Sequence, residues 1–137
     1  MTIVGFNLTS IKAERTKPIE GKINVKNNVK IDEIKESQLM VGKQKQKTLI
    51  FEFSYLSKYS PNMGGVEIKG SLVYLTDVKT IDEIVKNWKG GKGKSVPEDI
   101  MAPVLNTVLN KCSIMALQMS KEVNLPPQIQ LPKVKVN

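Results

Sequence analysis

The sequence contains no histidine and only one cysteine, Cys112. Histidine is the commonest general base near neutral pH and the commonest metal ligand, so its absence removes the usual catalytic triads and most zinc sites. A single cysteine cannot form an internal disulfide, which fits a reducing compartment. No run approaches the roughly 18 apolar residues that predict a membrane-spanning helix, and no signal-peptide pattern is visible. We therefore expect a cytoplasmic protein with no metal, no cofactor and no membrane insertion.

Arginine is also nearly absent. All but one of the 21 basic residues are lysine, and the net charge is +8. Lysine acts as a hydrated point charge, whereas the reading of base edges and the bidentate clamping of phosphates favour arginine. The composition disfavours sequence-specific DNA recognition and leaves contact with RNA open.

Alternating apolar and polar residues predict four strands in the first half of the chain. Their ranges are Ile3–Arg15, Lys22–Ile31, Thr48–Tyr59 and Val66–Thr76. A change of parity between Leu8 and Ile11 predicts a bulge in the first strand, and Gly70 predicts a bulge or a close approach of backbones in the fourth. The connections are short and polar, including 43–47, which predicts an antiparallel meander.

Two helices are predicted in the second half. A capping box at Thr80–Glu83 opens a short helix with Ile81, Ile84, Val85 and Trp88 on one face. A second capping box, Ser95–Glu98, precedes a turn, a fresh start at Pro103 and a long helix ending before Pro126. The apolar stripe of this helix consists of Leu105, Val108, Leu109, Cys112, Met115, Ala116, Met119 and Val123.

These elements predict a single α+β domain over residues 1–137, with a four-stranded antiparallel sheet, both helices packed on one face and an extended C-terminal tail. We expect Val108, Cys112 and Met119 to be buried against Phe51 and Phe53. The alternating residues Glu52 and Ser54 then point to the other face.

Catalytic patterns are weak. Gly93-Lys94-Ser95 matches the end of a phosphate-binding loop, but the glycine required five residues earlier is Trp88. Cys112 lies on an apolar stripe with no histidine to activate it. The paired carboxylates fall in polar segments or first helical turns, where they complement the helix dipole. We predict no catalytic residues and no enzyme activity.

The order of the strands and helices resembles the SecB-type protein-export chaperones. The motif that carries the resemblance is the proline-interrupted helix at Met101-Ala102-Pro103, followed by the proline-rich and leucine-rich segment 123–132. The resemblance implies a curved sheet, assembly into dimers or tetramers, and apolar grooves that hold unfolded polypeptide. The chain departs from the family in its basic charge and in its cysteine-free tail, so docking on an export ATPase is not expected.

Two functions follow, and both remain open. The leading one is a non-enzymatic binding protein that holds extended apolar polypeptide, forms a homo-oligomer and uses five candidate residues: Trp88, Met101, Leu125, Ile129 and Leu131. The alternative is a basic factor that contacts ribosomal or other RNA through two groups of lysines: Lys43, Lys45, Lys47, Lys89, Lys92 and Lys94.

Overall fold

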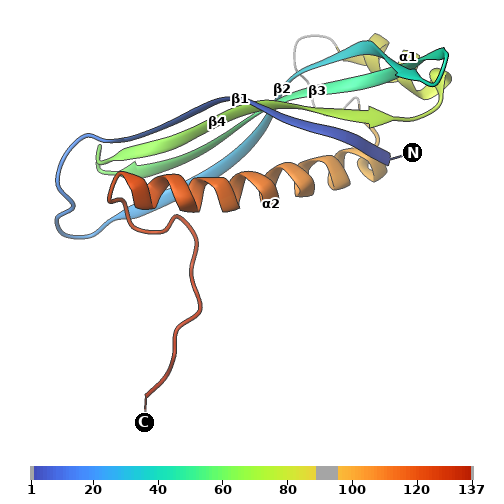
Figure 1. Ribbon diagram of the computed structural model, residues 1–137. Helices are drawn as coiled ribbons and strands as arrows, with labels where there is room; N and C mark the ends of the chain where they lie inside the picture. The colour runs from blue at the N-terminus through green and yellow to red at the C-terminus, as the bar shows by residue number, and fades with distance from the viewer. Residues whose placement is uncertain (1, 89–95, 137) are drawn as a thin grey trace.

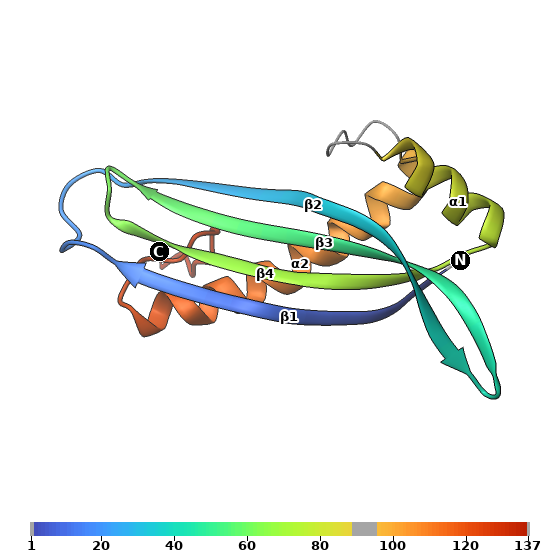
Figure 2. The same ribbon diagram turned by 90° about the horizontal axis from the view of Figure 1, so that it is seen from above.

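The computed structural model describes residues 2–88 and 96–136, which form a four-stranded antiparallel sheet and two helices (Figure 1). The elements are β1 (Thr2–Arg15), β2 (Asn24–Val41), β3 (Gln44–Ser60), β4 (Gly64–Leu75), α1 (Val78–Asn87) and α2 (Glu98–Glu122). The long helix α2 runs along the sheet, and a tail leaves its end (Figures 1 and 2). This architecture confirms the predicted α+β fold class.

The core lies between α2 and one face of the sheet. It is built from alternate residues of β3 and β4 and from every fourth residue of α2, and its fully buried members include Phe51, Phe53, Tyr55, Ile68, Leu72, Val104, Val108, Cys112 and Ala116. Glu52 and Ser54 are only partly buried, as expected for the opposite face. The predicted register is therefore confirmed, although Met119 packs at the margin of the core and is only partly buried.

The strand order is β1-β4-β3-β2, so the predicted meander is wrong. β1 pairs with β4 from Thr2 opposite Leu75 to Arg15 opposite Gly64. The segment 16–23 crosses the end of the sheet, and the Thr16 N–H donates to the Met63 carbonyl at 3.0 Å. This crossing packs Ile19 and Ile23 of the connection against a buried cluster. A tight β1–β2 turn would leave that cluster exposed to water.

β2 and β3 extend well beyond the predicted strands. A bulge between Ile31 and Glu33 changes the parity of β2, which then continues to Val41. The segment 43–47 is not a polar connection, because β3 begins at Gln44 and only Gly42 and Lys43 form the turn. Backbone pairing needs no apolar side chains, so a polar segment completes the hairpin once its partner strand is in place.

The predicted bulge in β1 is confirmed between Leu8 and Ser10. Gly70 lies opposite Leu8, and a Cβ added there would overlap the Asn7 carbonyl oxygen and approach Phe53 Cζ to 2.8 Å. The glycine therefore allows a close approach of β1, whose Phe6 ring stacks on Phe53 at a centroid distance of 5.2 Å.

The first helix is capped by a residue upstream of the predicted capping box. Asp77 accepts a hydrogen bond from the Thr80 N–H at 3.1 Å and another from the Thr80 hydroxyl at 2.8 Å. The helix therefore begins at Val78, because a carboxylate at the cap position satisfies the free N–H groups of the first turn. The predicted apolar face is confirmed, since Ile81 and Ile84 are buried.

The second helix has no break at Pro103. It is continuous from Glu98 to Glu122, with Pro97 as its cap residue; Ser95 of the predicted capping box lies outside the described residues. Pro103 and Asp99, whose carbonyl would accept the missing hydrogen bond, are both exposed. Water can satisfy that carbonyl, and burial of Ile100 and Val104 holds the two flanking turns on the sheet.

By length and composition alone, α2 would be able to cross a membrane. Its buried residues, from Ile100 through Val108 to Ser120, form the stripe that packs on the sheet. Asn106, Asn110 and Gln118 are exposed on the other side of the helix. This division of the surface is typical of the core helix of an α+β domain.

Candidate functional site

The end of α2 is joined to the sheet by a second apolar cluster. Tyr59, Met63 and Leu125 are buried in it. Helix α2 ends where Asn124 adopts a positive φ of 61°, which directs Leu125 inward, and the Leu125 N–H donates to the Ser120 carbonyl at 2.8 Å. This ending matches the predicted stop before Pro126 and turns the chain across the helix.

Hydrogen bonds then fix the first part of the tail. The Tyr59 hydroxyl donates to the Pro126 carbonyl, and burial raises the pKa of this phenol. The Gln128 amide donates to the Ser113 carbonyl at 2.7 Å, and the Asn27 amide donates to the Gln128 carbonyl at 2.9 Å. The alternation of apolar and polar residues in the tail predicts that the segment Ile129–Val136 packs across a helix or a sheet edge. The structure anchors the tail as far as Gln128, but Val134 and Val136 are 91% exposed, so the prediction is wrong for the end of the tail.

An apolar groove of about 650 Å³ lies beside this anchor. One wall comes from the 16–23 connection, the floor from α2 and the other wall from the tail. The apolar lining residues are Ile19, Ile23, Leu117, Leu125, Pro126, Pro127 and Leu131. The polar lining residues include Ser120 and Asn124, and the charged one is Lys121. A groove with this lining can bury apolar side chains, and we take it as the candidate site.

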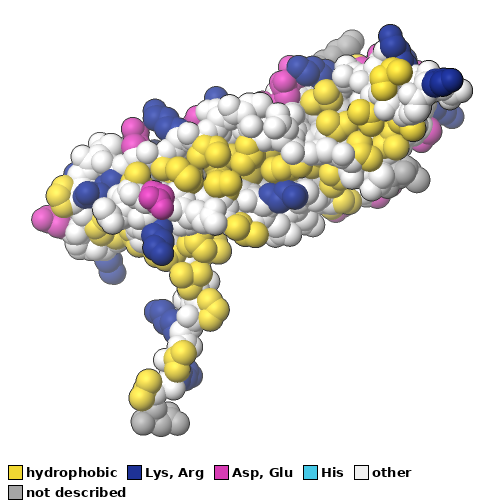
Figure 3. All heavy atoms as spheres, viewed as in Figure 1, with side chains coloured by type: hydrophobic (Ala, Val, Ile, Leu, Met, Phe, Trp, Pro, Cys, Tyr) yellow, Lys and Arg dark blue, Asp and Glu magenta, His cyan; other side chains and the backbone are white. Residues whose placement is uncertain are grey.

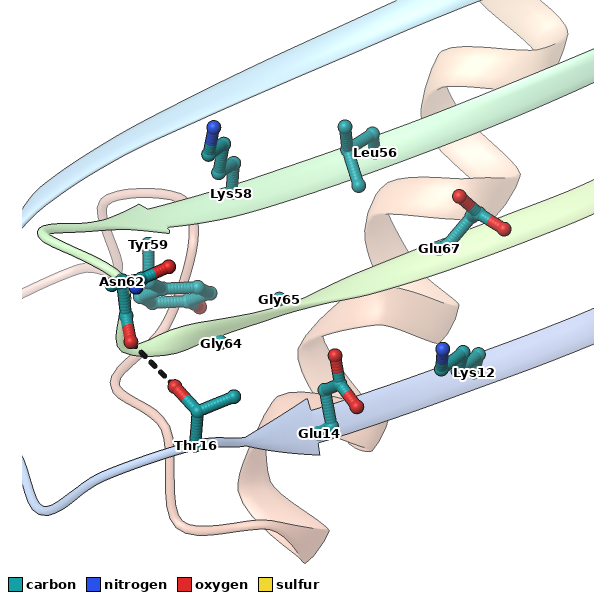
Figure 4. A pocket seen from close by; sticks show the side chains of 10 residues that line it. All are labelled: Lys12, Glu14, Thr16, Leu56, Lys58, Tyr59, Asn62, Gly64, Gly65 and Glu67. Atoms are coloured by element: carbon teal, nitrogen blue, oxygen red, sulfur yellow. Dashed lines mark hydrogen bonds between the residues drawn. The ribbon is translucent and has the colours of Figure 1, made fainter.

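A second hollow, of about 340 Å³, lies on the opposite face of the sheet (Figure 4). Gly64 and Gly65 leave its floor without side chains, while Lys12 and Glu67 stand at its margin (Figure 4). Its lining carries charges of both signs, and it is smaller than the groove at the end of α2. Within residues 2–88 and 96–136, no group of three metal-binding side chains comes together.

The structure separates the five residues predicted to bind polypeptide. Leu125 and Leu131 meet in the groove, whereas Ile129 is exposed on the tail and does not line it. Trp88 is buried in the core and Met101 is partly buried against it, near the start of α2. Ile19, Ile23 and Leu117 also line the groove but were not predicted as site residues. Ile23 was hidden because it alternates with Val25 in the predicted strand Lys22–Ile31, whereas β2 begins only at Asn24. Ile19 and Leu117 fit neither a strand face nor the helical stripe, which was the available signal.

Three of the six lysines predicted to contact RNA, Lys43, Lys45 and Lys47, lie in the β2–β3 hairpin. Lys43 and Lys45 are exposed near the hairpin turn. Lys47 is held by Glu36 at 3.2 Å and Asp82 at 3.5 Å, and its hydrogen bond to Glu36 contributes most to its raised pKa. The second group, Lys89, Lys92 and Lys94, lies outside the described residues, so RNA contact stays a prediction.

A further apolar surface runs along the molecule where β1 lies beside α2 (Figure 3). Ile3, Phe6 and Leu8 of β1 are only partly buried there. The Lys111 ammonium lies 5.1 Å from the centre of the Phe6 ring, so part of this surface is covered by the stem of a lysine.

Comparison with known proteins supports the fold. No protein-family model matches the sequence, and no curated protein matches it either. A similar solved structure is the Mycobacterium tuberculosis Rv1957 SecB-like chaperone in complex with a ChAD peptide from Rv1956 HigA1 antitoxin. It aligns with a TM-score of 0.57 and 6% sequence identity, over 96% of this chain and 89% of that one. The chain therefore has a SecB-like fold, as its sequence predicted.

Proposed function

We propose that this protein is a non-enzymatic, chaperone-like binding protein that holds extended apolar segments of other polypeptides. The observation that carries the proposal is the groove at the end of α2, whose walls are aliphatic and proline side chains. The Rv1957 structure, a SecB-like chaperone bound to a peptide, supports a polypeptide as the ligand for this fold.

The chemistry of the walls favours broad selectivity. Pro126 and Pro127 have no backbone N–H, so this wall cannot pair with a bound strand through a regular ladder of hydrogen bonds. Binding then depends on burial of apolar side chains against Ile19, Ile23 and Leu117, which discriminates weakly among aliphatic residues. Lys121 adds one positive charge among the lining residues, so we expect neutral or acidic segments to bind better than basic ones.

Leu131 makes the groove partly self-occupied. It lines the groove but is 44% exposed, and it follows the last anchored residue, Gln128. An incoming polypeptide can displace Leu131 without breaking the hydrogen bonds of the anchor. Removal of the residues after Gln130 should therefore preserve or strengthen binding.

Fluorescence anisotropy with a labelled, leucine-rich, neutral peptide tests the proposal. Ile23→Gln and Leu117→Gln should each weaken binding about tenfold or more, because each places an amide in the apolar lining. The matched control is Leu109→Gln, an exposed leucine of the same helix that does not line the groove. Equal losses in the control and the groove variants, or no binding by the wild type, would contradict the proposal.

We also expect the protein to form a homo-oligomer. β1 and β2 are the edge strands of the sheet, and the β1 residues Val4 and Ile11 are more than 40% exposed. Unpaired strand edges with apolar residues favour pairing with another subunit. Sedimentation equilibrium measures this directly, and a protein that remains monomeric at high micromolar concentration would defeat the expectation.

A further inference from the structure

The β2–β3 hairpin continues past the region of the core and twists away from the rest of the sheet (Figure 2). We call residues 38–46 the hairpin tip. Its turn is formed by Gly42, with a φ of 63°, and Lys43. Glycine at the first position of a two-residue turn suits the twist of a tight hairpin. The tip is therefore an ordered, projecting element.

Three consecutive apolar residues are exposed on this tip. Leu39 is 40% exposed, Met40 is 58% exposed and Val41 is 52% exposed. Leu39 and Val41 pair with Gln46 and Gln44, which places these four side chains on one face of the ladder. Met40 pairs with Lys45 on the other face. The apolar surface therefore wraps around the strand instead of forming a single flat side.

The charge of the tip has one sign. The sequence contains no acidic residue from Ser37 to Phe51. Lys43 and Lys45 are exposed, while Lys47, at the base of the tip, is paired with Glu36 and Asp82. Apolar and basic side chains lie together at the end of the molecule that carries the hairpin and α1 (Figure 3).

These features restrict the partner. Exposed aliphatic side chains in a row add nothing to the binding of RNA, whose recognition relies on charge and aromatic stacking. A protein partner would have to surround both faces of the narrow hairpin. The boundary between lipid headgroups and acyl chains is fluid, accepts apolar side chains from every direction, and presents phosphates to flanking lysines.

We propose that the hairpin tip attaches the protein peripherally to anionic lipid bilayers. Leu39, Met40 and Val41 enter the boundary between headgroups and acyl chains, and Lys43 and Lys45 contact lipid phosphates. The net charge of +8 attracts the protein to a negative surface before the tip inserts. The groove at the end of α2 lies far along the molecule from the tip and stays accessible in this orientation (Figures 1 and 2).

Vesicle flotation with the full-length protein tests the charge requirement. We expect binding to phosphatidylcholine vesicles that contain about a third phosphatidylserine, weaker binding at high salt, and none to pure phosphatidylcholine. The double variant Lys43→Gln/Lys45→Gln should lower the partition coefficient by on the order of 30-fold, from about 1 kcal/mol per lysine. Lys17→Gln/Lys22→Gln removes the same charge from the exposed 16–23 connection and should have a much smaller effect.

Insertion has its own readout. When the Met40→Cys variant is labelled with an environment-sensitive dye, the fluorescence emission of the dye should shift to shorter wavelength on addition of anionic vesicles. The native Cys112 is fully buried, and burial raises the pKa of its thiol to about 11, so the dye reacts at position 40. Leu39→Gln/Val41→Gln should lose vesicle binding, whereas Leu109→Gln should retain it.

Three results would overturn the proposal. The first is no binding of the wild type to anionic vesicles. The second is vesicle binding that is unaffected by all tip variants. The third is that the protein does not bind vesicles and the Lys43→Gln/Lys45→Gln variant loses a different interaction. Loss of RNA binding in this variant would assign the tip to RNA, and loss of self-association would assign it to a second copy of the chain.

Discussion

The two ends of the β2–β3 ladder are built from the same pair of strands but have different surroundings. At one end, Tyr59 and Val25 pair beneath the end of α2 and the 16–23 connection, and Tyr59 is fully buried. At the other end, Leu39 and Met40 pair with Gln46 and Lys45, and both apolar residues are at least 40% exposed. Apolar residues occur at both ends, so their presence alone does not determine where the core lies.

The difference shows that apolar residues of the sheet are buried only where another segment of the chain folds back over them. The end near Tyr59 is covered by the connection and by the tail, and hydrogen bonds hold that cover in place. The hairpin tip remains exposed, and the ion pairs of Lys47 with Glu36 and Asp82 lie at its base. We therefore expect substitutions at the covered end to affect stability, and substitutions at the tip to affect interactions.

The largest expected effect is the loss of stability when the tail segment that packs over Tyr59 is removed. Truncation after Asn124 removes the buried Leu125 and leaves the Tyr59 hydroxyl without its carbonyl partner. Loss of a buried leucine and of a partly buried hydrogen bond should lower the free energy of unfolding by at least about 3 kcal/mol and promote aggregation. Truncation after Gln130 keeps Leu125 and the Tyr59 hydrogen bond, and it should change the free energy of unfolding by less than about 1 kcal/mol. Urea denaturation of the two truncated proteins measures the difference, and equal stabilities would refute the anchoring role.

A smaller loss is expected at the centre of the core. Val108 is fully buried under the sheet, whereas its neighbour Leu109 is 40% exposed. Val108→Ala should lower the free energy of unfolding by about 2–3 kcal/mol, because it leaves a cavity. Leu109→Ala should lower it by less than about 1 kcal/mol. If thermal and urea denaturation rank the two variants in the opposite order, the assignment of the buried face of α2 is wrong.

The hairpin tip should tolerate substitution. The triple variant Leu39→Ala/Met40→Ala/Val41→Ala should change the free energy of unfolding by less than about 1 kcal/mol, because these side chains are largely exposed in the folded chain. Circular dichroism during urea denaturation provides the measurement. A strongly destabilised variant would show that the tip residues are buried in solution, for example in an oligomer.

The smallest expected effect concerns the helix beside the base of the tip. Hydrogen bonds from Thr80 lower the pKa of Asp77 below its ordinary value of 3.8. The cap therefore contributes stability that is fully present above the ordinary pKa and is lost as the pH falls through the lowered one. Asp77→Asn keeps a capping side chain and should reduce the slope of stability against pH below pH 4 or so, with little change at pH 7. An unchanged slope would contradict the assigned cap.

Local patterns predicted the parts of this molecule that depend on nearby residues. The alternation around Phe51 and Phe53, the bulge after Leu8, the face of α1 that carries Ile81 and Ile84, and the end of α2 before Pro126 all follow from spacing and backbone preference. Where several local signals competed, the prediction was less accurate. Asp77 and Thr80 both suit a cap, and only the observed hydrogen bonds distinguish them.

The candidate site was only partly predictable. Leu125 and Leu131 could be proposed because they follow a long helix in a proline-rich segment. Ile19 and Ile23 could not, because they contribute to the groove only through a connection that crosses the whole end of the sheet. Trp88, at the end of α1, and Met101, near the start of α2, pack in or on the core and do not line this groove, because an apolar residue at a helix end has the same pattern in either setting.

The sequence by itself determined the four strands, the two helices, the buried faces of β3 and β4 and the fold class, because these depend on the period of the side chains along one segment. Only the tertiary structure decided that β1 lies beside β4, that residues 43–47 belong to a hairpin, and that α2 passes Pro103 without a break. Each of these depends on pairing or packing between segments distant in the chain, whose free energy outweighs local preference and leaves no mark in the local pattern.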